Sequence, residues 1–338
     1  MQLSHEGDYI ENLTKVIFDV KGLVHPPERI VAFPRFVPDP QGSRKRKGIT
    51  YRKVYALPER FKLLEERFPH YLVFDPVFGE RLCEVPEKDV QCHYNPVDRL
   101  QELRSGSQLD PLEADALLFM NLLHSHSSVP WDKLGISGSL LARLYTPCSD
   151  IDPIIYGTNN CFKVYKALKS LMKNGANGVK AYTKKELKAL YKFRSQDTKM
   201  SFEDFVATDC RKVLQGKFLH HDFFIRCVKD WNEVEELYGD IVYGRVGYGK
   251  IKAIVSDDSE AIFTPCRYSV DHVRKLEGTW EGSVTEVVSF RGRFCEQAKK
   301  GETIVAQGKV EKVQKKNGDT FLRFLLGGKP SDHMILEG

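Results

Sequence analysis

Residues 135–152, which read GISGSLLARLYTPCSDID, decide the fold of the central part of this chain. The pair Gly138-Ser139 opens a short helical stretch that Pro147 ends, and a strand follows that begins with Asp150-Ile151-Asp152. Because successive side chains of a strand point to opposite faces, the two aspartates should share one face. The residue between them, Ile151, should point into the core.

This arrangement predicts a metal site beside a phosphate-binding turn. Two carboxylates on one face repel each other unless a positive charge lies between them, and hard divalent cations prefer oxygen ligands of this kind. Gly138 lets the backbone approach a ligand closely, and at a helix start the free N–H groups favour phosphate. Ser139 adds a hydroxyl donor.

A third carboxylate is expected from a strand predicted over residues 218–228. The segment 217–226 reads KFLHHDFFIR, and Asp222 is the single acid within it. Burial of such an acid is costly unless it is paired or bound to a metal. Strand alternation places His220 on the face of Asp222, and we expect ordinary packing or hydrogen bonding for both His220 and His221.

These motifs resemble those of a known superfamily. A Gly-Ser pair, ten intervening residues, Asp-x-Asp and an aspartate in a later strand resemble the DNA polymerase beta-like nucleotidyltransferases, across about residues 130–228. With its amino-terminal module and β-rich tail, the chain looks like an archaeal family of predicted nucleotidyltransferases. The resemblance implies that Asp150 and Asp152 bind two metal ions. It also implies that Asp222 binds the catalytic metal and orients or deprotonates the attacking hydroxyl.

The same resemblance implies a substrate and a cofactor. Gly138 and Ser139 would hold the β- and γ-phosphates of a nucleoside triphosphate, with Mg²⁺ or Mn²⁺ as the metal. Arg143 lies one turn beyond Ser139 and could reach a phosphate, although a surface salt bridge explains it equally well. Pro153 departs from the family pattern, because it removes a ladder hydrogen bond and requires a bulge or an edge there.

Each motif also has a plain structural explanation. Gly138-Ser139 could be an ordinary strand-to-helix turn, Asp150 a turn acid, and Asp222 a buried acid paired with Arg226 or a lysine. Two alternatives to catalysis therefore stay open. One is an inactive nucleotidyltransferase fold that binds RNA or DNA, and the other is a scaffold whose basic faces dock a partner.

Composition and pattern set the wider organisation. The 338 residues are 41% hydrophobic and 29% charged, as in globular proteins, and carry a net charge of +5. We expect an α+β protein with an α/β module over 1–108, a catalytic domain with a central mixed sheet over 109–248, and a small β-barrel over 249–338. No apolar run approaches bilayer length, which favours a cytoplasmic protein without membrane contact.

Two further patterns concern partners. None of the eight cysteines forms a Cys-x-x-Cys pair, so their spacing does not predict structural zinc. Basic clusters occur at Arg44–Lys47, with Arg52 and Lys53, and at 184–194, and aromatic residues lie among them. They are either solvated faces or contacts to nucleic-acid phosphates. The sequence carries no signal of the oligomeric state.

Overall fold

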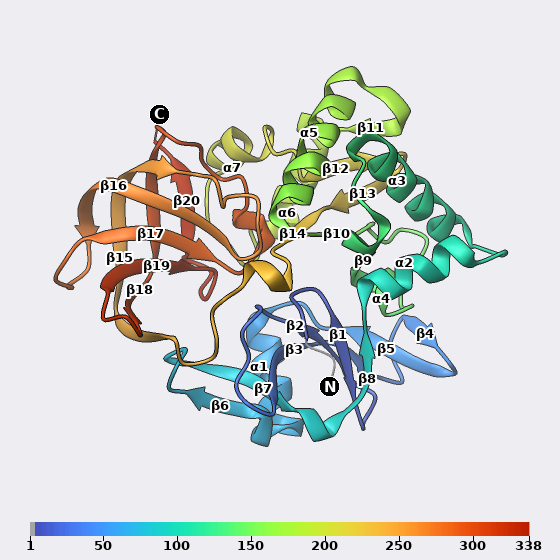
Figure 1. Ribbon diagram of the computed structural model, residues 1–338, viewed down its shortest axis with the longest axis horizontal. Helices are drawn as coiled ribbons and strands as arrows, with labels where there is room; N and C mark the ends of the chain where they lie inside the picture. Colours follow the sequence, from blue (N-terminus) through green and yellow to red (C-terminus); the bar gives the residue numbers. More distant parts are fainter. Residues whose placement is uncertain (1–3, 338) are drawn as a thin grey trace. The chain divides into compact units, whose positions relative to one another are not determined.

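The computed structural model describes residues 4–337 and confirms the α+β class (Figure 1). The described residues form two compact units. The first unit consists of residues up to 73, 82–181 and 213–235, and the second of 74–81, 182–212 and the residues from 236 onward. The expected catalytic segment 109–248 contributes to both units.

An antiparallel sheet dominates the amino-terminal part. Its strands follow the order β4, β5, β3, β2, β1 and β8, and β7 pairs with both β3 and β6. Helix α1 begins with Pro58 in its first turn, a position that favours proline, and packs on β3. The bounds are β1 Tyr9–Asn12, β2 Ile17–Val20, β3 Arg29–Pro38, β4 Arg44–Arg46, β5 Ile49–Lys53, α1 Leu57–Arg67, β6 Leu72–Asp75, β7 Glu80–Pro86 and β8 Val90–Tyr94.

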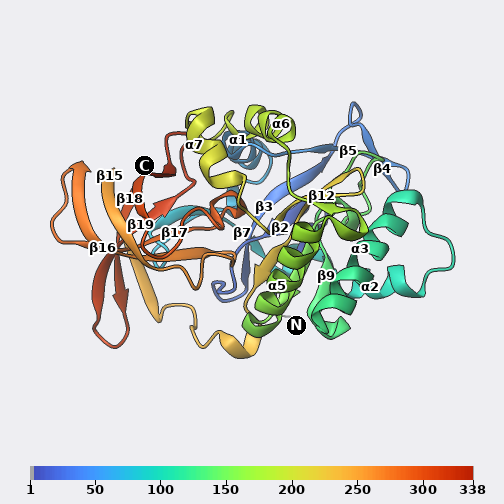
Figure 2. The ribbon, with the colours of Figure 1, turned by 90° about the horizontal axis from the view of Figure 1, so that it is seen from above.

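Two small sheets and four helices complete the first unit. Strand β10 lies between β14, to which it is parallel, and β9, to which it is antiparallel, while β11, β12 and β13 form an antiparallel sheet. Helices α3 and α5 pack against each other (Figure 2). The bounds are α2 Pro96–Ser105, α3 Pro111–Ser127, β9 Leu134–Ile136, α4 Gly138–Leu141, β10 Pro153–Tyr156, α5 Thr158–Asn174, β11 Val179–Lys180, β12 Gln215–Phe218, β13 His221–Phe224 and β14 Arg226–Val228.

The strand predicted over 218–228 is wrong as a continuous element. Leu219 has a left-handed backbone, with φ of 53°, and starts a turn that folds β12 back onto β13. Asp222 therefore lies in a hairpin, directly opposite Lys217. Pro153 is the first residue of β10, which is one of the few strand positions that tolerates proline. Because β10 begins at Pro153, the strand accommodates the proline although it lies between β14 and β9 and not at the edge of the sheet.

The second unit contains a closed ring of strands. β15 pairs with β16, β16 with β17, β17 with β19, β19 with β18, and β18 again with β15. This five-stranded ring with one parallel pair, β17 and β19, has the Greek-key arrangement of small barrels. The bounds are α6 Lys184–Arg194, α7 Phe202–Asp209, β15 Ile241–Asp257, β16 Cys266–Glu277, β17 Val284–Ser289, β18 Thr303–Lys315, β19 Thr320–Leu326 and β20 His333–Leu336.

The barrel encloses its own core. Tyr268, Phe294 and Phe324 are among its buried side chains.

Single 3₁₀ turns occur at Pro69–Tyr71, Glu87–Asp89, Trp131–Lys133, Ala176–Gly178, Trp231–Glu233 and Gly292–Phe294. Within residues 4–337, no helix combines the length and the apolar character that crossing a membrane requires.

Candidate functional site

Three aspartates lie on one face of two neighbouring parallel segments. Ile151 and Phe223 form a parallel bridge, and the Ile151 N–H donates a 2.9 Å hydrogen bond to the Asp222 carbonyl. Both apolar side chains are fully buried, at 0% and 1% exposure. Because bridged residues share a face and neighbours along a strand alternate, this register assigns Asp150, Asp152 and Asp222 to the opposite face. The register thus aligns the three acids that the sequence singles out.

Gly138 is in close contact with the second of these acids. Its φ is +66°, and a Cβ placed on it would lie 1.8 Å from Oδ2 of Asp152. Ser137 fixes the same segment, because its N–H donates a 2.9 Å hydrogen bond to the Asp152 carbonyl. Ser139 follows in α4 and is buried. Only glycine satisfies both the left-handed backbone and the close approach at position 138.

The environment of Asp152 disfavours a second negative charge. Burial, and after it the neighbouring carboxylate of Asp150, raise the pKa of Asp152 to about 6, against the opposing effect of Lys53, Arg226 and Arg35. A cation bound beside this carboxyl group would stabilise its charged form. The pair of acids is therefore suited to a divalent metal ion.

Basic side chains from the amino-terminal sheet approach these acids. Burial and the neighbouring Arg35 lower the pKa of Lys53 to about 8, while Asp150 and Asp152 act to raise it. The Nε of Arg35 is buried without a hydrogen-bond partner in the described part of the chain. The pKa of Arg44 is lowered by burial and raised by Asp150. The site thus combines carboxylates with cations that an anionic ligand could pair with.

The hairpin of β4 and β5 also holds the segment that follows the Gly-Ser turn. Arg44 donates to the carbonyl of Leu144, and Nη1 of Arg46 donates to the carbonyl of Ala142 at 3.1 Å. Arg46 is also paired with Glu11. Part of the basic cluster predicted to contact nucleic acid is therefore used inside the protein.

Asp222 is assigned to the same face as Asp150 and Asp152, but its carboxylate does not form a close group with theirs. Nζ of Lys217 lies 3.0 Å from Oδ1 of Asp222, whose side chain is 49% exposed. This is the lysine ion pair that the sequence left open, whereas Arg226 pairs with Glu6 at 2.7 Å. Among residues 4–337, the three aspartates do not form a group with all ligand atoms within 4.8 Å of one another.

Arg143 and the second basic cluster face solvent. Nη2 of Arg143 lies 2.6 Å from Oε2 of Glu102, and both side chains are about half exposed. Arg143 is thus seen in a surface ion pair. The residues of the cluster over 184–194 line α6, whose Leu187 is buried while Lys184, Lys185, Lys188 and Lys192 are exposed.

Sequence reasoning missed the contribution of Arg35. It lies in the apolar run of β3, where a lone cation is as costly to bury as the lone acid at position 222. The same argument that singled out Asp222 could have found Arg35. Its proximity to Asp152, however, depends on contacts between distant segments.

The fold and the site define an α+β protein that presents three aspartates from two neighbouring segments, with the partly buried cations Arg35, Arg44 and Lys53 near Asp150 and Asp152. The chain belongs to the family of the uncharacterized protein MJ1086 of Methanocaldococcus jannaschii, to which it is 32% identical over 328 residues. The alignment covers 95% of this chain and 94% of that protein. No model of a protein family matches the chain, and no solved structure matches it significantly.

Proposed function

We propose that this protein is a metal-dependent nucleotidyltransferase that moves a nucleoside monophosphate from a nucleoside triphosphate to an acceptor hydroxyl. One observation carries the proposal. The bridge between Ile151 and Phe223 places Asp150, Asp152 and Asp222 on one face, and the backbone of Gly138 lies against one of these carboxylates. Carboxylates arranged next to a glycine turn fit both a metal ion and a phosphate chain.

The residues present fit a divalent cation. Asp150 and Asp152 would hold Mg²⁺ or Mn²⁺, because burial and the repulsion from Asp150 raise the pKa of Asp152 even though Lys53, Arg226 and Arg35 oppose the shift. Bound metal ions would stabilise the attacking and leaving oxygens of an in-line displacement. Asp222 would complete the ligand set after giving up its ion pair with Lys217.

The protein's own groups have distinct tasks in the reaction. The acceptor oxygen forms a bond to the α-phosphorus, and the bond from that phosphorus to the oxygen bridging to the β-phosphate breaks, so that pyrophosphate leaves. Asp222 orients the hydroxyl and accepts its proton. Arg35 and Lys53 compensate the negative charge of the phosphates. The Nε of Arg35 supports this role, because it has no hydrogen-bond partner among residues 4–337. Gly138 and Ser139 position the phosphate chain.

The acceptor in this proposal is a nucleic acid, RNA or DNA, in the cytoplasm. The exposed lysines of α6 support it, as do the exposed Lys45 and Lys47 of the hairpin of β4 and β5. Lysines presented to solvent in this number attract the phosphates of a polynucleotide.

A second function is favoured by a specific observation. Asp222 is paired with Lys217, and the three acids do not converge to metal-binding distances in the described chain. An inactive member of the fold that binds RNA or DNA and uses the acids structurally would have this arrangement. Divalent-metal binding separates the two functions.

To test for nucleotidyl transfer, the purified protein is incubated with each labelled nucleoside triphosphate, Mg²⁺ or Mn²⁺, and pooled tRNA or DNA oligonucleotides. We expect label transfer that is lost in Asp150→Ala/Asp152→Ala. The matched control is Glu65→Ala/Glu66→Ala, which removes the same charge from an exposed part of α1 and should keep the activity. Absence of both transfer and metal-dependent triphosphate binding would contradict the proposal and favour the non-catalytic function.

A further inference from the structure

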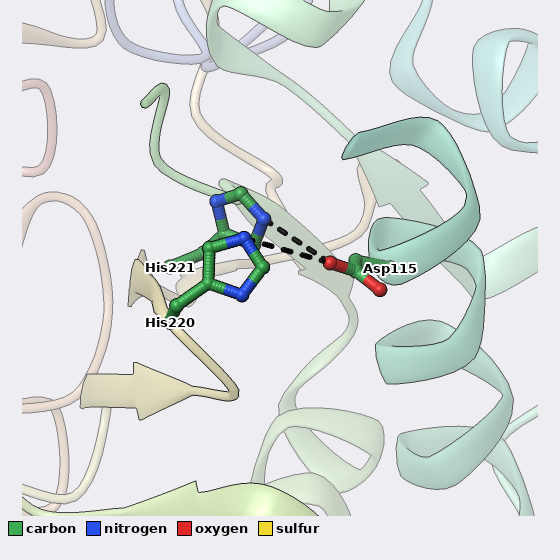
Figure 3. Close-up of side chains that lie close together, drawn as sticks. All are labelled: Asp115, His220 and His221. Carbon is green, nitrogen blue, oxygen red and sulfur yellow. Dashed lines mark hydrogen bonds and ion pairs between the residues drawn. The ribbon is translucent and has the colours of Figure 1, made fainter. Parts of the chain in front are cut away.

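A second group of metal-ligating side chains lies outside the set of three aspartates. Asp115 of α3 faces His220, which lies in the turn before β13, and His221, the first residue of β13 (Figure 3). One ligand atom from each lies within 4.8 Å of the others. Nε2 of His221 is 3.2 Å and Nε2 of His220 is 3.9 Å from Oδ2 of Asp115.

The turn explains why two consecutive histidines reach the same carboxylate. In a continuous strand they would point to opposite faces. The left-handed backbone of Leu219 ends β12, and the two imidazole rings then lie side by side with centroids 3.9 Å apart. The side chain of His220 is 72% exposed, whereas that of His221 is 3% exposed. The group is therefore open to an ion from solvent on one side.

The hydrogen bond on the far side of His221 fixes its tautomer. Nδ1 lies 3.2 Å from the carbonyl oxygen of Ser149, and a carbonyl can only accept, so Nδ1 carries a proton. Nε2 of the same ring faces Oδ2 of Asp115, so these two atoms require a cation between them, which is either a second ring proton or a metal ion. Histidines that bind metals commonly donate their other N–H to a backbone carbonyl.

We propose that Asp115, His220 and His221 form a binding site for a transition-metal dication of the zinc class. Two imidazole nitrogens and one carboxylate suit zinc, whereas Mg²⁺ prefers oxygen ligands alone. Tetrahedral ligands about 2.0 Å from zinc lie roughly 3.3 Å apart, so the observed separations need only small side-chain movements. Water would fill the fourth position.

Such an ion connects three segments of the first unit. It joins α3 to the turn before β13 and, through the hydrogen bond of His221, to the residue that precedes Asp150. Asp222 directly follows His221 in the chain. Zinc would therefore stabilise the segments that present Asp150 and Asp222, without being one of the ions that those acids bind.

The test measures zinc binding by the untagged, full-length, metal-stripped protein in excess Mg²⁺, by competition with a chromophoric chelator. We expect one zinc ion per chain in the wild type. His220→Ala should lower the zinc affinity at least tenfold, and Asp115→Asn should weaken it similarly. His220 is chosen because its exposed side chain can be removed without opening the core.

The matched control is His126→Ala, which removes another exposed histidine from the end of α3. It should bind zinc like the wild type. Zinc should also raise the melting temperature of the wild type and of the His126 variant, but not that of the His220 variant. Equal zinc affinity in the His220 variant and the wild type, or no stoichiometric binding, would overturn the proposal and leave a plain histidine–carboxylate ion pair. Because no nucleotide is present, the result is independent of nucleotidyl transfer.

Discussion

Gly138 combines two constraints that can be separated by mutation. A Cβ at this position would lie 1.8 Å from Oδ2 of Asp152, and the backbone is left-handed. Gly138→Ala should therefore displace the carboxylate, lower metal-dependent activity by about a hundredfold, and destabilise the fold by roughly 2 kcal/mol or more. Nucleotidyl transfer and urea-induced unfolding of the purified variant measure the two effects.

The control for this prediction is Gly175→Ala. Gly175 has a similar φ of +59°, but nothing lies within 4 Å of a Cβ built there. It should show only the backbone cost, on the order of 1 kcal/mol, with unchanged activity. Equal activity in the two variants would show that the contact between Gly138 and Asp152 is unimportant.

His25 gives the first unit a pH-dependent stability. Burial lowers its pKa to about 4. The ring is held neutral, because Nδ1 accepts from the Val31 N–H at 3.3 Å and Nε2 lies 3.0 Å from the Ser4 carbonyl. Since the folded pKa lies below the unfolded value near 6.5, this stability is present above pH 6.5 and is lost as the pH falls towards 4. The upper bound is roughly 3 kcal/mol.

Urea unfolding between pH 4 and pH 7.5 measures this effect. We expect His25→Gln to flatten the decline in the free energy of unfolding below pH 6.5 compared with the wild type. His70→Gln, which changes a side chain that is 62% exposed, should leave the decline unchanged. Parallel curves for the wild type and the His25 variant would contradict the prediction.

At the scale of elements, sequence patterns predict those helices and strand faces that depend on interactions between residues close together in the chain. The apolar residues of α5 recur with the period of a helix, and Thr183 and Glu186 have capping-box spacing at the start of α6, so both helices can be predicted from the sequence. The alternation around Ile151 predicted that its side chain points into the core, and it is fully buried in the structure. These features depend on neighbouring residues, which a single sequence contains.

The hairpin of β12 and β13 is an element that these sequence patterns did not predict. The apolar residues that flank His220, His221 and Asp222 predicted one strand, because Leu219 carries no signal for a left-handed backbone. The error concealed the approach of both histidines to Asp115. The position of Arg35 near the acids was equally hidden, since it depends on packing between segments more than a hundred residues apart.

The whole molecule is built from interleaved segments, with consequences for the second unit. Lys212 is buried and donates to the Arg293 carbonyl at 2.7 Å and to Oε1 of Gln297 at 3.0 Å. Arg293 is in turn paired with Asp197. Residues 182–212 are therefore part of the packing of the barrel, although unit 1 residues separate the two in the chain.

Fragments test this dependence. A fragment spanning 236–338 should unfold at a lower urea concentration than one spanning 182–338, with a difference of about 3 kcal/mol or more, because its buried polar groups lose their partners. Circular dichroism of both fragments gives the comparison. Equal midpoints would mean that the barrel is stable without α6 and α7.

The crossing of the chain between the two units also limits how genes of this family can change. The chain passes from one unit to the other after residues 73, 81, 181, 212 and 235. A single recombination event at any point between the first and the last of these would join halves of two different ancestors inside at least one hydrophobic core. We therefore expect variation among relatives to accumulate through point substitutions and loop insertions, and not through the exchange of whole modules.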